Sequence, residues 1–141
     1  MSVSGRLIGV DVGVKRIGVA RTDPLQLSVN PVATWSPAEV MDRIGEIVKE
    51  GPVAAFVVGW PLHSDGREGE STRMVSRFVN QLEKTFPGIP VEQVDERYSS
   101  QQAMELLIET GVPRNKRAEK GMLDQAAAVL ILHHYMKSSG G

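Results

Sequence analysis

The stretch Leu7-Ile8-Gly9-Val10-Asp11-Val12-Gly13 predicts a β-strand that ends in a tight turn, and apolar residues resume at 17–20 to form a second strand of a hairpin. Even-numbered residues of the first strand share one face, and odd-numbered residues, including Asp11, share the other. The glycines around Asp11 leave its carboxylate unshielded, which favours a close approach by a cation. Asp and Gly are also ordinary turn residues, so the pattern alone leaves a structural role open.

The rest of the chain alternates between predicted strands and helices. Ser36, Pro37 and Glu39 form a helix start with a capping box, and this helix stops near Gly51. The other predicted elements are strands at 31–35, 53–59 and 90–95 and helices at 74–82, 99–111 and 121–134. This order predicts an α/β fold with a five-stranded mixed sheet, in which an antiparallel meander of three strands is followed by parallel strands.

Length and composition indicate one globular domain. The chain has 141 residues, so we expect a single domain over 1–137 and a frayed tail at 138–141. Cysteine is absent, which excludes disulfides, thiolate zinc sites and cysteine nucleophiles. Because no signal peptide or long apolar run is seen, we expect a cytoplasmic protein without membrane contact. The net charge of −1 provides no general attraction to a polyanion.

Acidic residues follow or begin three separate elements. Asp95 and Glu96 lie where the strand 90–95 ends, at the edge of an α/β sheet where ligands gather. Asp124 lies in the first turn of the last helix, on a flank shared with Ala127, Ala128 and Ile131. A solvated turn would also explain the first pair, and the helix dipole would also explain Asp124.

These acids make sense together as a metal site. Mg²⁺ prefers a few carboxylates together with water and phosphate oxygens, which suits Asp11, Glu96 and Asp124. Without a cation the three carboxylates would repel one another. Spacing along the chain does not establish that the three meet, and Asp95 is a less certain ligand than Glu96.

Basic residues gather in two places. Lys15 and Arg16 lie in the predicted hairpin, and a second group precedes Asp124: Arg114, Lys116, Arg117 and Lys120. Both groups are candidates for phosphate contacts, although charged runs are usually solvated.

Four segments resemble, in order, the motifs of the YqgF (RuvX) family of proposed resolvases and ribosomal-RNA-processing nucleases. They are residues 9–20, 57–69, 95–100 and 120–127, and the resemblance extends from Gly9 to His134. It implies a ribonuclease H-like fold and hydrolysis of phosphodiesters dependent on Mg²⁺ or Mn²⁺. Metal-ligand and catalytic roles pass to Asp11, Glu96 and Asp124, and a phosphate contact to Arg97. Trp60 and Tyr98-Ser99-Ser100 depart from the family pattern without removing an acid.

The leading hypothesis is therefore a metal-dependent endonuclease of structured RNA or branched DNA, acting on the 5′ end of pre-16S rRNA or on four-way DNA junctions. A non-catalytic nucleic-acid-binding or ribosome-assembly adaptor is the alternative. An actin-like ATP-binding domain is a further one, because the glycine–aspartate hairpin resembles its phosphate-binding loop. A junction-cutting enzyme is expected to be a homodimer, whereas an RNA-processing enzyme can be a monomer.

Overall fold

The computed structural model describes residues 5–60, 70–95, 100–109, 111, 113–117 and 121–138. Its strands form one sheet in the order β3-β2-β1-β4-β5. Strand β1 is antiparallel to β2 and parallel to β4, β2 is antiparallel to β3, and β4 is parallel to β5. The predicted mixed sheet is confirmed. The strand bounds are β1 Arg6–Val12, β2 Ile17–Thr22, β3 Val29–Trp35, β4 Val53–Trp60 and β5 Val91–Asp95.

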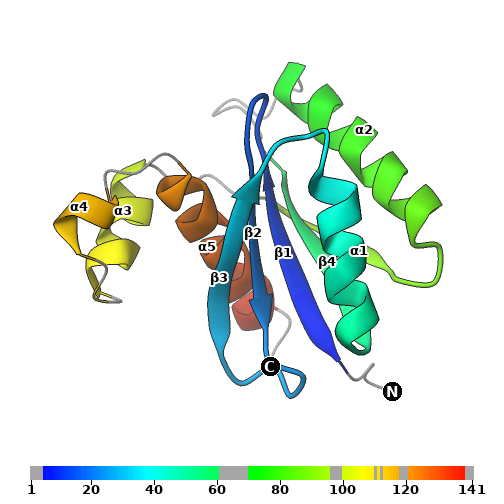
Figure 1. Cartoon of the computed structure of the whole chain (residues 1–141), viewed down its shortest axis with the longest axis horizontal. Helices are drawn as coiled ribbons and strands as arrows, with labels where there is room; N and C mark the ends of the chain where they lie inside the picture. Colours follow the sequence, from blue (N-terminus) through cyan, green and yellow to red (C-terminus); the bar gives the residue numbers. More distant parts are fainter. Residues whose placement is uncertain are drawn as a thin grey trace.

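Helices cover both faces of the sheet (Figure 1). Helices α1 (Val40–Glu50) and α2 (Glu70–Thr85) pack on one face, and α5 (Met122–Ser138) packs on the other. Helices α3 (Ser100–Glu109) and α4 (Arg114–Arg117) lie on the side of α5 that faces away from the sheet (Figure 1). None of the described helices is both long enough and apolar enough to cross a membrane.

Strand alternation divides the interior into two cores, as the pattern of β1 predicts. Ile8 and Val10 are fully buried against α1 and α2. Leu7 faces the other way and joins the core against α5. Asp11 has the same parity as Leu7, so its side chain lies on the α5 face.

Helix α5 is buried on more sides than the predicted flank of Ala127, Ala128 and Ile131 suggests. Besides the sheet, it packs against Leu107 of α3, which adds a third small core. Ala126, Val129 and Leu132 are therefore buried together with the residues of the predicted flank, Ala127, Ala128 and Ile131. The sheet and α3 enclose the helix from two directions, and this fixes its position firmly.

Some predicted boundaries differ from the structure. Helix α1 begins at Val40 and not at Pro37, because residues 37–39 form a turn closed by the Glu39 N–H and the Ser36 carbonyl at 3.2 Å. Only one side of the capping box is observed: the Ser36 N–H donates to the Glu39 carboxylate at 3.5 Å. Helix α4 was not predicted, and Ser99, where the predicted helix 99–111 begins, lies outside the described residues.

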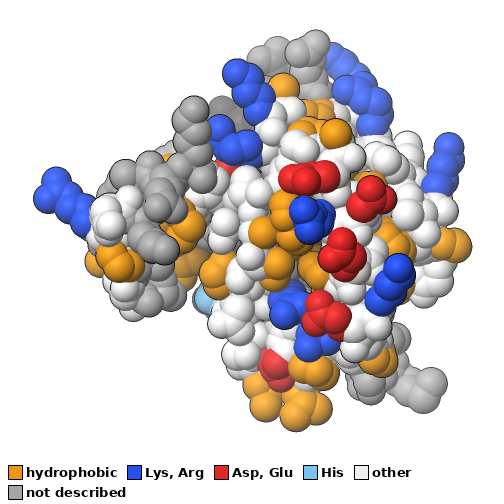
Figure 2. Space-filling model, viewed as in Figure 1, with side chains coloured by type: hydrophobic (Ala, Val, Ile, Leu, Met, Phe, Trp, Pro, Cys, Tyr) orange, Lys and Arg blue, Asp and Glu red, His pale blue; other side chains and the backbone are white. Residues whose placement is uncertain are grey.

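The connection between β2 and β3 is organised by Asp23. Its carboxylate accepts N–H bonds from Ser28 and Leu27, both at 2.6 Å, and from Leu25 at 3.0 Å. These bonds, that from Ser28 above all, hold the pKa of Asp23 below its ordinary value of 3.8. The turn leaves Leu25 and Leu27 74% and 79% exposed. Apolar side chains gather at the lower end of the face shown in Figure 2, where Figure 1 draws the connection between β2 and β3.

Candidate functional site

Three residues form a row across the first three strands. Asp11 of β1 pairs with Gly18 of β2, and Gly18 pairs with Thr34 of β3. Paired residues share a face of the sheet, so the row lies on the face covered by α5. Glycine in the interior of a strand packs poorly and often marks a close approach by another part of the chain.

The start of α5 lies directly on this glycine. A Cβ atom added to Gly18 would be 2.9 Å from the Cβ atom of Asp124 and would collide with its backbone carbonyl. Any side chain at position 18 would therefore occupy the space that Asp124 fills. Gly9, two residues before Asp11, allows the same close approach further along α5, because an added Cβ would lie 2.6 Å from Cγ of Leu132.

This packing brings Asp11 and Asp124 together although they are far apart in sequence. Directly paired Cβ positions lie about 5 Å apart, so the Cβ atoms of Asp11 and Asp124 are separated by no more than about 8 Å. Both residues lie on the face of the sheet that α5 covers, beside the first turn of that helix. At this separation two carboxylates are able to reach one cation.

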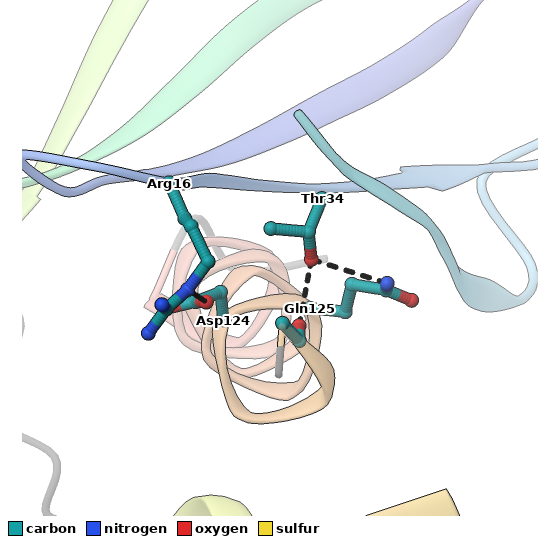
Figure 3. A network of polar contacts seen from close by, with 5 residues as sticks. Arg16, Thr34, Asp124 and Gln125 are labelled. Atoms are coloured by element: carbon teal, nitrogen blue, oxygen red, sulfur yellow. Dashed lines mark hydrogen bonds and ion pairs between the residues drawn. The ribbon is translucent and has the colours of Figure 1, made fainter. Parts of the chain in front are cut away.

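Thr34 fastens the start of α5 to the sheet (Figure 3). Its hydroxyl donates to the Gly121 carbonyl at 2.6 Å and accepts a bond from Nε2 of Gln125 at 3.1 Å. Gly121 has a φ of +94°, a left-handed conformation that favours glycine, and an added Cβ would lie 2.8 Å from Oγ1 of Thr34. The contacts of Thr34 thus determine where the first turn of α5, and Asp124 with it, rests on the sheet.

On the other side of the same turn, Asp124 is held by a cation. Nε of Arg16 donates to Oδ2 of Asp124 at 2.9 Å (Figure 3). The Arg16 side chain is 47% exposed, whereas that of Asp124 is 23% exposed. Arg16 was predicted as a nucleic-acid contact, and in the structure its guanidinium is engaged with a predicted metal ligand.

The remaining predicted ligands are Glu96 and Asp95. Glu96 lies outside the described residues, and no group of three metal-binding side chains occurs within the described part of the chain. Asp95 pairs with Trp60, and the parity of β5 places both on the face of α1 and α2, opposite to Asp11. As the last residue of β5, Asp95 also borders an open cavity beside α5.

The predicted phosphate contacts are dispersed. Lys15 is exposed in the connection between β1 and β2, next to Arg16. Arg114 is exposed on α4, and Lys116 and Arg117 belong to the same short helix, which lies away from the sheet (Figure 1). Arg97 and Lys120 lie outside the described residues.

Sequence reasoning missed several residues that shape the site. The sequence pattern assigned no catalytic or ligand-binding role to Gly18 or Thr34, although a glycine inside a strand is a recognisable signal of close packing.

An open cavity of about 780 Å³ between β5 and the end of α5 was also not predicted. It is lined by Gln93, Val94, Asp95, His134, Tyr135, Lys137 and Ser138. Burial raises the pKa of Tyr135 above its ordinary 10.0, and nearby Glu92 adds to the effect.

Solved structures with a similar fold include two enzymes described with four-way DNA. The structure of T. thermophilus RuvC in complex with Holliday junction substrate has a TM-score of 0.59 at 17% identity, covering 96% of each chain. The Fowlpox virus resolvase, described in complex with Holliday junction DNA, has a TM-score of 0.56 at 14% identity, covering 95% of this chain and 98% of its own. At these identities the likeness concerns the fold, which is ribonuclease H-like, as the motif resemblance implies.

Closer relatives cover almost the whole chain. A protein of Chlorobium phaeobacteroides is 43% identical over 135 residues, covering 96% of this chain and 94% of its own length. One of Chlorobium luteolum is 42% identical over 141 residues, covering 100% of both. Each is named "Putative pre-16S rRNA nuclease". Residues 5–138 match the family described as "RuvX: Holliday junction resolvase". The chain therefore belongs to the RuvX family of nucleases.

Proposed function

We propose that this protein is a divalent-metal-dependent endonuclease that cleaves structured RNA, with the 5′ end of pre-16S rRNA as its substrate. The observation that carries the proposal is the meeting of Asp11 and Asp124 over Gly18, on one face of the sheet. The names of relatives 43% and 42% identical to this chain support RNA as the substrate. A reaction on pre-rRNA also agrees with the cytoplasmic location expected from the sequence.

The chemistry of the site fits Mg²⁺ or Mn²⁺. The Asp124 carboxylate already accepts a bond from a cation, the Arg16 guanidinium, so its position suits a positively charged partner. Carboxylate oxygens are the ligands that Mg²⁺ prefers in proteins. We propose that Asp11, Glu96 and Asp124 hold the ion, and we leave Asp95 out because its strand position favours the opposite face.

Each residue then has a distinct task. A bound ion supplies stabilisation of the negative charge that develops on the phosphodiester and a lower pKa for an attacking water. Asp11 is fixed by β1 in the middle of the sheet, and Asp124 is fixed by the seating of α5 on Gly18. Rigid elements on both sides hold the two carboxylates in place, which favours precise positioning of the reacting groups. Lys15 is exposed beside this site and is proposed to bind the substrate backbone.

Four-way DNA junctions are the second candidate substrate. The family description names a Holliday junction resolvase, and this is the observation that favours it. Resolution needs paired cuts related by two-fold symmetry, so this function would require a homodimer. A monomer is sufficient for the RNA reaction.

Cleavage assays test the proposal. Purified protein is incubated with Mg²⁺ or Mn²⁺ and either a precursor-rRNA fragment or a four-way junction, with Asp11→Asn as the control. We expect cuts in the RNA that are abolished by EDTA and reduced at least about 100-fold by Asp11→Asn, because the site loses a central charge. Symmetric cuts in the junction alone would assign the protein to DNA. Cleavage by Asp11→Asn at the wild-type rate would refute the site, and RNA binding without any cleavage would favour the adaptor alternative.

A further inference from the structure

Arg16 and Asp124 differ sharply in how firmly they are held. Asp124 belongs to a helix that is packed on Gly18 and bonded to Thr34 through the preceding turn. Arg16 lies in the connection between β1 and β2, and about half of its side chain is exposed. The carboxylate is therefore fixed, whereas the guanidinium is on a long side chain that is able to leave. Its neighbour Lys15 is exposed in the same connection.

The ion pair uses a group that the proposed metal site needs. Nε of Arg16 donates to Oδ2 of Asp124 at 2.9 Å, so one carboxylate oxygen is already engaged. The pair also offsets repulsion between Asp124 and Asp11, which both adjoin Gly18 on the same face of the sheet. A divalent ion bound by Asp124 would lie close to the Arg16 guanidinium. The two positive charges would repel each other at such a short distance.

We propose that Arg16 is the resident counter-ion of Asp124, that a divalent cation displaces it, and that the released guanidinium then binds a substrate phosphate. This inference rests on the proposed metal site. It makes Arg16 a positioning residue that links the two events: the metal frees Arg16, and Arg16 then adds a phosphate contact. Guanidinium groups bind phosphate in the same charge-assisted way as carboxylate, so the exchange replaces one anionic partner with another.

Two roles for the contact between Arg16 and Asp124 predict opposite changes in metal affinity, so the two roles are separable by experiment. Hydrogen bonds to a ligating carboxylate often orient it and strengthen metal binding. If Arg16 worked in that way, removing it would weaken the site. Displacement predicts the reverse, so the sign of the change in metal affinity separates the two.

The experiment measures Mn²⁺ binding by electron paramagnetic resonance, which detects free Mn²⁺, for wild type and Arg16→Gln. The matched control is Arg21→Gln, since Arg21 lies on the adjoining strand and pairs with Glu50 at 3.2 Å in a comparably exposed ion pair. We expect Arg16→Gln to lower the Mn²⁺ dissociation constant about two- to fivefold, the range typical of ion pairs at this exposure. The control is expected to leave the constant unchanged. In an Asp124→Asn background, the effect of Arg16→Gln should disappear.

A second readout follows the released guanidinium. Binding of labelled precursor rRNA is measured by fluorescence anisotropy with EDTA and with Ca²⁺, whose loose coordination disfavours the reaction. Arg16→Gln should weaken RNA binding with Ca²⁺ and reduce the slope against salt concentration by about one. With EDTA it should have little effect, because Arg16 is then held by Asp124.

The outcomes separate the two proposals. If wild type binds Mn²⁺ through Asp124 but Arg16→Gln binds it equally or more weakly, the displacement is refuted and the metal site stands. If Mn²⁺ binding does not depend on Asp124 at all, both proposals fall. Arg16 is exposed, so its variant is expected to fold, and circular dichroism of each protein checks this.

Discussion

Replacing Gly18 by alanine would disturb the site without touching an acidic residue. The added methyl group would lie 2.9 Å from the Cβ atom of Asp124 and would collide with its carbonyl, whereas ordinary contacts begin at 3.4 Å. The clashing atoms belong to the backbone of Asp124, so no side-chain movement can relieve the clash. The start of α5 would have to move away from the sheet by about 1 Å to restore van der Waals separation.

Two consequences are expected. Inserting a methyl group into a packed interface typically costs about 1–3 kcal/mol, and a clash with backbone belongs at the upper end of that range. For a domain of this size, 2–3 kcal/mol corresponds to a fall of about 6–9 °C in Tm. Because Asp124 moves with the helix, cleavage should fall by about 100-fold, the loss typical of a 1 Å misplacement.

The assay is urea unfolding followed by circular dichroism, together with the cleavage rate in Mg²⁺ at a temperature where the variant is folded. Gly88→Ala is the control, since an added Cβ there would meet nothing within 4 Å. This variant should stay within about 0.5 kcal/mol of wild type and keep its activity. If Gly18→Ala matched wild type in both stability and cleavage, the seating of α5 on Gly18 would not be what positions Asp124.

Three further predictions concern Thr34, the turn between β2 and β3, and the later part of α5. Thr34→Val removes the hydroxyl bonded to Gly121 and Gln125, so urea unfolding should show a loss of about 1–2 kcal/mol, and unchanged stability would contradict the role of this network. Because folding lowers the pKa of Asp23, the stabilisation by its carboxylate is complete above pH 3.8 and is lost as the pH falls below that value. The difference in urea midpoint between wild type and Asp23→Asn should therefore shrink from pH 5 to pH 2. A constant difference would contradict the stabilising role of the Asp23 carboxylate in the turn. Partial desolvation, with a contribution from His134, lowers the pKa of His133 below 6.5, so stability should decline as the pH falls through 6.5. His133→Gln should flatten this decline in thermal unfolding between pH 8 and pH 5.

The sequence was sufficient to predict the local features on which the site depends. The two-residue period of β1 predicted the face of Asp11, since side chains alternate along any strand. Helical spacing predicted that Asp124 shares a flank with buried residues, and Ala127, Ala128 and Ile131 are all buried. Both inferences depend only on neighbours in the chain, which is why they could be made without a fold.

The meeting of the two acids could not be predicted in this way. It depends on where α5 crosses the sheet, and that position is set by contacts of Gly18 and Thr34 with residues about 100 positions away. The ion pair between Arg16 and Asp124 could not be predicted for the same reason, since 108 residues separate the two. The boundary of α1 was wrong because a tight turn at 37–39 satisfies the same serine and glutamate signals as a helix start.

Anomalous diffraction from crystals grown with Mn²⁺ tests the central claim most directly. We predict a peak bound by the carboxylates of both Asp11 and Asp124, with the Arg16 guanidinium no longer on Asp124. A crystal saturated with Mn²⁺ that shows no peak between these two carboxylates, with Arg16 still 2.9 Å from Asp124, would contradict the account.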